Sequence, residues 1–100
     1  MGVMSRVRLI RNPVVGTGSS EVTLGTSAGT ATSVNGATVL RLVNVSGATR
    51  KVTVVDKATG GLGIGSFSMP NNTTETVEKL AADLIFANGA VLATQVGFTN

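Results

Sequence analysis

The feature that most constrains this chain is a series of short runs of β-branched and other apolar residues, each ended by Gly, Asn, Ser or Pro. Within the runs, apolar and polar residues alternate, which is typical of strands, whereas a helix repeats its apolar residues every three to four positions. A chain of 100 residues has the size of one compact domain and no room for a second core. The sequence therefore predicts a single all-β domain over residues 1–100.

The runs can be placed by their turn residues. The predicted strands cover residues 5–11, 21–24, 32–34 (a weaker candidate), 39–45, 50–56, 66–69, 74–79, 84–87 and 91–98. Seven or eight short strands in a chain of this length are typical of a small β-sandwich, either Ig-like or jelly-roll-like. The run 39–45 has apolar residues on both faces, so it is predicted to be a central strand. It is expected to form a β-hairpin with 50–56 through a loop of about four residues.

Two further segments carry predictions about shape. Residues 59–65 are dominated by glycine and are expected to form a flexible loop before the strand at 66–69. Residues 14–37 are rich in Gly, Thr and Ser, and we interpret them as too polar for the core and as an intersubunit arm. The N-terminal part, residues 1–37, is therefore expected to be partly extended or arm-like.

One region admits two interpretations. Residues 75–87 contain several good helix formers, and Lys79 precedes Asp83 by the four residues of a helical ion pair. The same residues can be divided into two short strands with a corner at 80–83, closed by Asn88-Gly89. The strand interpretation is the one that we adopt.

Enzymatic chemistry has little support in the composition. The chain contains no His, Cys, Trp or Tyr and only five acidic residues. General acid and base catalysis near neutral pH most often uses His, and a nucleophilic Ser needs a base beside it. Disulfides and zinc sites, which stabilise many small domains, are also ruled out by these residue types. The sequence predicts a protein that is not an enzyme, uses no cofactor and gains stability from partners.

The individual motifs have simpler explanations. The glycine-rich residues 60–66 lack the Lys and the following helix of a phosphate-binding loop. A Ser–Lys dyad would require Lys79 to be neutral in an apolar pocket beside a serine. Glu75 and Glu78 are three residues apart, so on a strand they point to opposite faces and cannot act as a pair. No metal site is predicted, because the acidic residues are too scattered.

Charge gives the candidate interaction residues. The net charge is +3, and Arg6, Arg8 and Arg11 alternate with apolar positions in the first predicted strand. Arginines spaced in this way are typical of an edge or docking strand, and we expect these three to contact a partner. Nucleic acid is not the expected partner, because a longer basic stripe and stacking aromatics are missing. No signal peptide or membrane span is expected, so synthesis in the cytoplasm is predicted.

Four segments carry a resemblance to a known group of proteins. They are SRVRLIRN at 5–12, LRLVNVS at 40–46, GSFSMP at 65–70 and EKLAAD at 78–83. Across most of the chain the sequence resembles small β-rich virion structural proteins of marine tailed bacteriophages, including cyanophages. The shared features are patterns of strand and turn residues and do not include a catalytic motif.

The resemblance implies a structural component of the virion, most of all a capsid decoration (cement) protein on the outer shell. Its implied partners are the major capsid protein and further copies of itself, as a homo-oligomer with a trimer favoured, without nucleic acid or membrane. The alternatives are a tail-tube or connector component and a fibre-type binding module. The last usually needs an exposed aromatic platform, which a chain without Trp or Tyr lacks.

Overall fold

The computed structural model describes residues 6–9, 21–57 and 62–99. The elements are β1 (Arg6–Leu9), β2 (Glu21–Thr23), the 3-10 helix η1 (Ala28–Thr30), β3 (Val39–Asn44), β4 (Arg50–Asp56), β5 (Leu62–Met69), β6 (Thr73–Glu78), β7 (Leu84–Ala87) and β8 (Leu92–Thr99). The prediction of an all-β domain is confirmed. The weaker candidate at 32–34 is reduced to one isolated bridge, between Thr32 and Ile85.

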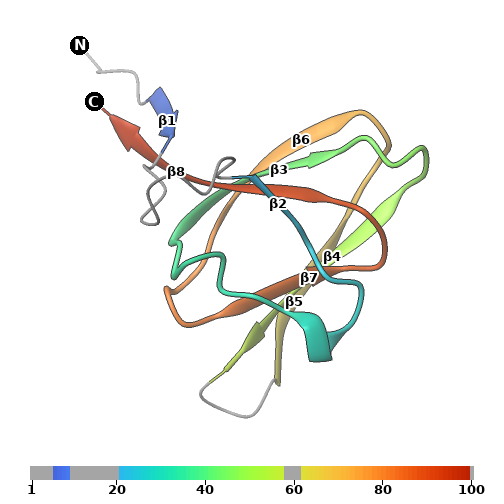
Figure 1. Ribbon diagram of the computed structural model, residues 1–100, viewed down its shortest axis with the longest axis horizontal. Coiled ribbons are helices and arrows are strands. Elements are labelled where there is room, and N and C mark those ends of the chain that lie inside the picture. Colours follow the sequence, from blue (N-terminus) through green and yellow to red (C-terminus); the bar gives the residue numbers. More distant parts are fainter. Residues whose placement is uncertain (1–5, 10–20, 58–61, 100) are drawn as a thin grey trace.

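The strands form two antiparallel sheets (Figure 1). The larger sheet has the order β1-β8-β3-β6, with β2 also paired to β8, and the smaller sheet has the order β5-β4-β7. The pairings are nested. β1 and β2 pair with β8, Thr32 with β7, β3 with β6, and β4 with β5. The chain is therefore one long hairpin folded over on itself, so that β3 also meets β8 and β4 also meets β7.

This connectivity distinguishes between the two predicted types of sandwich. An Ig-like sandwich pairs its first two strands with each other in one sheet. Here β1 and β2 both pair with β8, and the chain changes sheet between β3 and β4, between β5 and β6, between β6 and β7, and between β7 and β8. Such a rolled-up hairpin in two sheets is the arrangement of a jelly roll. The second strand of the roll is represented only by the bridge at Thr32.

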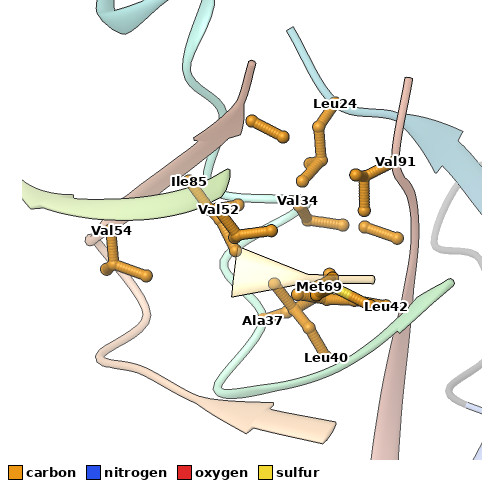
Figure 2. Packing of buried hydrophobic residues seen from close by; sticks show 12 residues of the cluster. Leu24, Val34, Ala37, Leu40, Leu42, Val52, Val54, Met69, Ile85 and Val91 are labelled. Carbon is orange, nitrogen blue, oxygen red and sulfur yellow. The ribbon is translucent and has the colours of Figure 1, made fainter. Parts of the chain in front are cut away.

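The core lies between the two sheets (Figure 2). Leu40 and Leu42 of β3 are fully buried and meet Val52 of β4 and Ile85 of β7 in one hydrophobic cluster. Residues two apart on a strand point to the same face, which is why alternate positions of β3 and β4 supply the core. On the other face of β3, Arg41 is exposed. The alternation read from the sequence therefore gives the correct inward face of β3.

The predicted hairpin between 39–45 and 50–56 is wrong. Both strands exist, but β3 belongs to the larger sheet and β4 to the smaller one, so residues 45–49 cross from one sheet to the other. The physical reason is Asn44, whose buried amide holds the chain in a corner at the end of β3. A turn-rich link of this length fits a corner as well as a hairpin, and the sequence does not separate them.

The flexible loop predicted at 59–65 is also partly wrong. Residues 58–61 lie outside the described part of the chain, but β5 already begins at Leu62 and includes Gly63 and Gly65. The ladder with β4 passes from Gly65 opposite Val54 to Gly63 opposite Val55, so that Ile64 is the extra residue of a β-bulge. Glycine in a strand often marks such a bulge. The glycines therefore shape a strand here instead of ending one.

The interpretation of 75–87 as two strands is confirmed. β6 ends at Glu78, residues 81–82 form a turn, and β7 begins at Leu84. Lys79 and Asp83 lie at opposite ends of this corner, so their spacing of four does not belong to a helix. Among the described residues no helix is long and apolar enough to cross a membrane.

The premise that residues 14–37 are too polar for the core is wrong for the described residues 21–37. Leu24, Val34 and Ala37 are buried and belong to the hydrophobic cluster. Three well-spaced apolar residues are enough to anchor a stretch that is otherwise Ser, Thr and Gly. Residues 10–20 lie outside the described part, and their role as an arm stays a prediction.

Candidate interaction surface

β8 extends beyond the body of the sandwich. Its residues 92–95 pair with β3 and its residues 92–94 with β2, whereas residues 96–99 pair, within the described part of the chain, with β1 alone. Figure 1 shows β1 and the end of β8 leaving the two sheets together. We call this antiparallel pair, residues 6–9 and 96–99, the terminal ribbon. It places the N-terminal strand at the edge of the larger sheet, as predicted.

Two of the three predicted interaction residues belong to the terminal ribbon. Arg6 lies opposite Thr99 and Arg8 lies opposite Gly97 in the ladder. Arg11 lies outside the described residues. The structure thus brings Arg6 and Arg8 onto one strand at alternate positions, and whether they contact a partner stays a prediction.

A polar corner closes the same end of the larger sheet. At this end Leu40 of β3 lies opposite Gln95 of β8, just before the terminal ribbon begins, and Val39 lies opposite Glu78, where β6 ends. The chain then turns through residues 79–83, which we call the Lys79 corner. Leu80 at this corner is 73% exposed, the most exposed large apolar side chain among the described residues. The ribbon and an exposed apolar side chain therefore lie at one end of the molecule.

The Lys79 side chain holds this corner together. It is buried, and its Nζ donates hydrogen bonds to the carbonyl oxygens of Ala37 at 2.7 Å, Leu80 at 3.2 Å and Ala81 at 3.4 Å. An ammonium group has three donors, so all of them are used. The hydrogen bond to Ala37 ties the end of β6 to the segment that leads into β3. This side chain fastens the edge strand of the larger sheet at one end.

The electrostatics of Lys79 follow from its burial. Burial lowers the pKa of Lys79 from its ordinary value of 10.5, because the charged form loses its hydration, and the nearby Asp83 carboxylate partly offsets this by raising it. The backbone N–H of Leu80 donates to Oδ2 of Asp83 at 3.1 Å, and the Asp83 N–H donates to the Leu80 carbonyl at 3.0 Å. Three carbonyl acceptors surround the ammonium group, an environment suited to a cation and not to the neutral base of a Ser–Lys dyad.

The opposite end of the larger sheet is closed by Asn44, which is completely buried. Its Nδ2 donates to the carbonyls of Met69 at 2.7 Å and Ala48 at 2.9 Å. Its Oδ1 accepts from the N–H of Ser46 at 3.0 Å and from the hydroxyl of Ser46 at 2.8 Å. All four hydrogen-bonding positions of the amide are filled. Asn44 therefore joins the corner after β3 to the end of β5 in the other sheet.

The remaining motifs do not assemble a reaction centre within the described residues. Glu75 and Glu78 are both exposed on β6 and lie opposite Leu42 and Val39 respectively. No group of three or more potential metal ligands occurs in the part of the chain that the structure describes. Leu62–Met69, within and after the glycine-rich stretch, is a strand and not the helix that would follow a phosphate-binding loop.

Sequence reasoning missed the two polar residues that fix the ends of β3 and β6. Asn44 follows Leu40 and Leu42 at the same parity, which places it on the core face, and a buried Asn must find hydrogen-bond partners. That parity was a usable signal. Lys79 offered no such signal, because its partners are backbone carbonyls brought together only by the fold.

Comparison of the chain with protein-family models, with curated proteins and with solved structures finds no match.

Proposed function

We propose that this chain is a non-enzymatic structural component of a tailed-phage virion, a capsid decoration protein that binds the outer shell and stabilises it. The proposal rests on the resemblance of its strand and turn segments to such proteins. The observation that carries it is the terminal ribbon, in which residues 96–99 of β8 leave the sandwich and pair with β1 alone among the described residues. This feature is what a docking element requires.

The energetics of the ribbon favour a bound state. A two-stranded ladder without further strands is only marginally stable in water. Covering the ribbon with a partner surface removes this weakness, and the stabilisation grows with the local concentration of partner, which is high on a shell built from many copies of one protein. The exposed Leu80 at the same end of the molecule adds apolar surface for the contact.

Charge supports an acidic or mixed partner surface. Arg6 and Arg8 occupy alternate positions of β1 in the ribbon, Arg11 follows it in the sequence, and the chain carries a net charge of +3. Complementary charge steers encounter and fixes the register of docking, even where single exposed pairs add little affinity. The ribbon therefore supplies both a surface and an orientation.

Localisation by cryo-electron microscopy of the virus that encodes the chain is the primary test. Many copies on the outside of an icosahedral shell are expected. A few copies or a ring at one vertex would instead support the tail-tube or connector alternative. Absence from the particle would overturn the structural role altogether.

The contact itself can be tested by charge reversal. The variant with Arg6, Arg8 and Arg11 all changed to Glu is expected to lose most of its shell occupancy. The matched control changes the exposed Arg41, Lys51 and Lys57 of the sandwich to Glu, which alters net charge by the same amount and leaves the ribbon intact. Equal occupancy of the two variants would show that the basic strand does not make the contact.

A further inference from the structure

The sheet edges of this molecule are not equally protected. The outer edge of β7 is covered, because Ile85 exchanges two hydrogen bonds with Thr32 and the N–H of Ala87 donates to the carbonyl of Gly25. The edge strand β6 carries Glu75 and Glu78, and charged residues on an edge discourage further pairing. β1 and β2 both pair with β8 and share the other edge of that sheet, where β1 carries two arginines and β2 carries Glu21. The fourth edge, β5, has no charged residue between Leu62 and Met69.

The hydrogen-bonding direction of β5 can be read from its neighbour. The backbone of Lys51 in β4 is bonded to Asn88, on the β7 side, through both its N–H and its carbonyl. In an antiparallel ladder successive residues alternate in the direction of their N–H and C=O groups, so Val52 must turn toward β5 and its partner Phe67 toward β4. The N–H and C=O groups of Ser66 and Ser68 therefore point away from β4, toward the edge of β5 with which no other strand pairs in the described part of the chain.

The length of this open edge is limited on both sides. The bulge at Ile64 interrupts the regular ladder before Gly65, and Pro70 follows Met69 and has no N–H. A regular stretch of 65–69 remains, with Phe67 at its centre. Ser66 and Ser68 flank Phe67 symmetrically and are both exposed.

We propose that this edge pairs with the same edge of a second copy of the chain, antiparallel and across a two-fold axis, with Phe67 opposite Phe67 of the second copy. In this register Ser66 meets Ser68 of the second copy and Ser68 meets its Ser66. These are the residues whose backbone groups face outward, so each pair can exchange two hydrogen bonds. Any shift of the register toward Pro70 loses a donor. The product is one continuous sheet, β7-β4-β5 followed by the same strands of the second copy in reverse order.

The chemistry of the edge favours a second copy over an unlike peptide. In a two-fold contact both copies present the same strand, so a charged edge strand meets like charges on the second copy, as β6 would through Glu75 and Glu78. β5 is free of that penalty, and the central Phe67 pair adds an aromatic cross-strand contact. An edge of five regular residues forms a small interface, so we expect a weak dimer that is populated at high local concentration. This inference holds whether or not the chain belongs to a virion.

Sedimentation equilibrium of the full chain over a range of about 10 µM to 1 mM tests the proposal, since a weak dimer dissociates within it. A concentration-dependent dimer is expected. Ser66→Lys with Ser68→Lys puts lysine against lysine at both outward pairs, and the dissociation constant should rise about tenfold or more. The matched control, Thr74→Lys with Thr76→Lys on the β6 edge, should keep the dimer. Urea unfolding of each variant verifies that the sandwich is intact.

A mixing experiment fixes the partner. Ser66→Glu with Ser68→Glu should also be monomeric alone, whereas an equimolar mixture of the Lys and Glu variants should form a heterodimer. A single Phe67→Cys substitution in this cysteine-free chain should give a disulfide-linked dimer on mild oxidation, and Thr76→Cys should not. A monomer at about 1 mM, a trimer, or a dimer that survives the lysine substitutions would overturn the proposal.

Discussion

The side-chain amide of Asn44 donates a hydrogen bond of 2.7 Å to the carbonyl oxygen of Met69, which joins the last residue of β3 in one sheet to the last residue of β5 in the other. The backbone repeats the connection, because the N–H of Asn72 donates to the Asn44 carbonyl at 2.7 Å. The two crossings between sheets, after β3 and after β5, are therefore held at one point. These hydrogen bonds hold the two sheets together at this corner, in a chain that has no cysteine to form a disulfide.

Asn44→Leu should destabilise the protein, even though the position is completely buried and leucine is the more apolar side chain. The substitution removes the Asn44 donor from the carbonyl of Met69, whereas the Ala48 carbonyl keeps a hydrogen bond from the Ser46 hydroxyl at 3.2 Å. A buried unsatisfied group costs about 1–3 kcal/mol. We expect a loss of about 2–4 kcal/mol in the free energy of unfolding, measured by urea denaturation. Asn71→Ala is the control, because Asn71 is exposed and accepts one hydrogen bond, from Gly47, so its loss should stay below about 1 kcal/mol. Equal losses in the two variants would contradict the role of Asn44.

Lys79→Met should loosen the opposite corner. The buried ammonium group supplies a donor to the Ala37 carbonyl that methionine cannot replace, although its methylenes can still pack. A loss of about 1–3 kcal/mol at neutral pH is expected from urea unfolding. The exposed Lys51→Met on β4 should change stability by less than about 0.5 kcal/mol. If both lysines proved equally dispensable, the hydrogen bonds of Lys79 would not stabilise the corner.

The pH dependence of Lys79 has a definite sign. Its pKa in the folded protein is lowered below 10.5 by burial, so between the folded pKa and 10.5 the unfolded chain binds more protons than the folded one. Stability contributed by this residue must therefore rise with pH through that alkaline window. The free energy of unfolding of the native chain, relative to Lys79→Met, should increase as pH is raised toward 10.5. A flat or falling difference would mean that the three carbonyls and Asp83 outweigh desolvation.

The alternation of apolar and polar residues was sufficient to predict most of the strands, but not residues 62–65 of β5. Leu40 and Leu42 in β3, and Val52 and Val54 in β4, are buried at every second position, because a period of two reflects backbone geometry and needs no tertiary information. The two-strand interpretation adopted for residues 75–87 is also confirmed, with β6 ending at Glu78 and β7 beginning at Leu84. The positions of these strands and their buried faces were thus predictable from the sequence.

The order of the strands was not accessible, for a physical reason. Whether residues 45–49 form a hairpin or a crossing depends on where the Asn44 amide finds its partners, and Met69 lies 25 residues away in the sequence. The candidate interaction surface was likewise predictable only in its local part. Alternation indicated that Arg6 and Arg8 belong to an edge strand, but only the ladder with residues 96–99 reveals a ribbon beyond the sandwich. The open edge of β5 was hidden by glycines that we interpreted as a loop.

Gly25→Ala should weaken the segment that covers the edge of β7. A Cβ at this position would lie 2.6 Å from the carbonyl oxygen of Thr30 and would also overlap the Thr30 side chain, so the 25–32 segment must shift. That shift moves the Gly25 carbonyl and weakens the hydrogen bond that it accepts from the N–H of Ala87. Overpacking of this kind costs about 1–3 kcal/mol, measurable by urea unfolding.

The control for Gly25 lies in the same segment. A Cβ at Gly29 would have only the Ser27 hydroxyl nearby, at 3.9 Å, an ordinary contact. Gly29→Ala should therefore be neutral or slightly stabilising, by reducing the freedom of the unfolded chain. Hydrogen exchange at Ala87 should accelerate in the Gly25 variant and not in the Gly29 variant. Similar exchange in both would show that the close approach at Gly25 is not what holds the cover in place.

Asn35 lies in a left-handed stretch, and substitutions there should follow backbone preference and not side-chain contact. Val34, Asn35 and Gly36 have φ values of 52°, 58° and 69°, and Val34 is nevertheless buried in the core. A β-branched residue is unfavourable in this region, so burial of Val34 must offset the strain. The exposed Asn35 tolerates the conformation better, and glycine tolerates it best. Asn35→Gly should therefore leave the free energy of unfolding unchanged or raise it by a few tenths of a kcal/mol, while Asn35→Val should lower it by about 1–2 kcal/mol. Both are measured by urea unfolding, and a valine variant as stable as the glycine variant would mean that the turn does not hold residue 35 in the left-handed region.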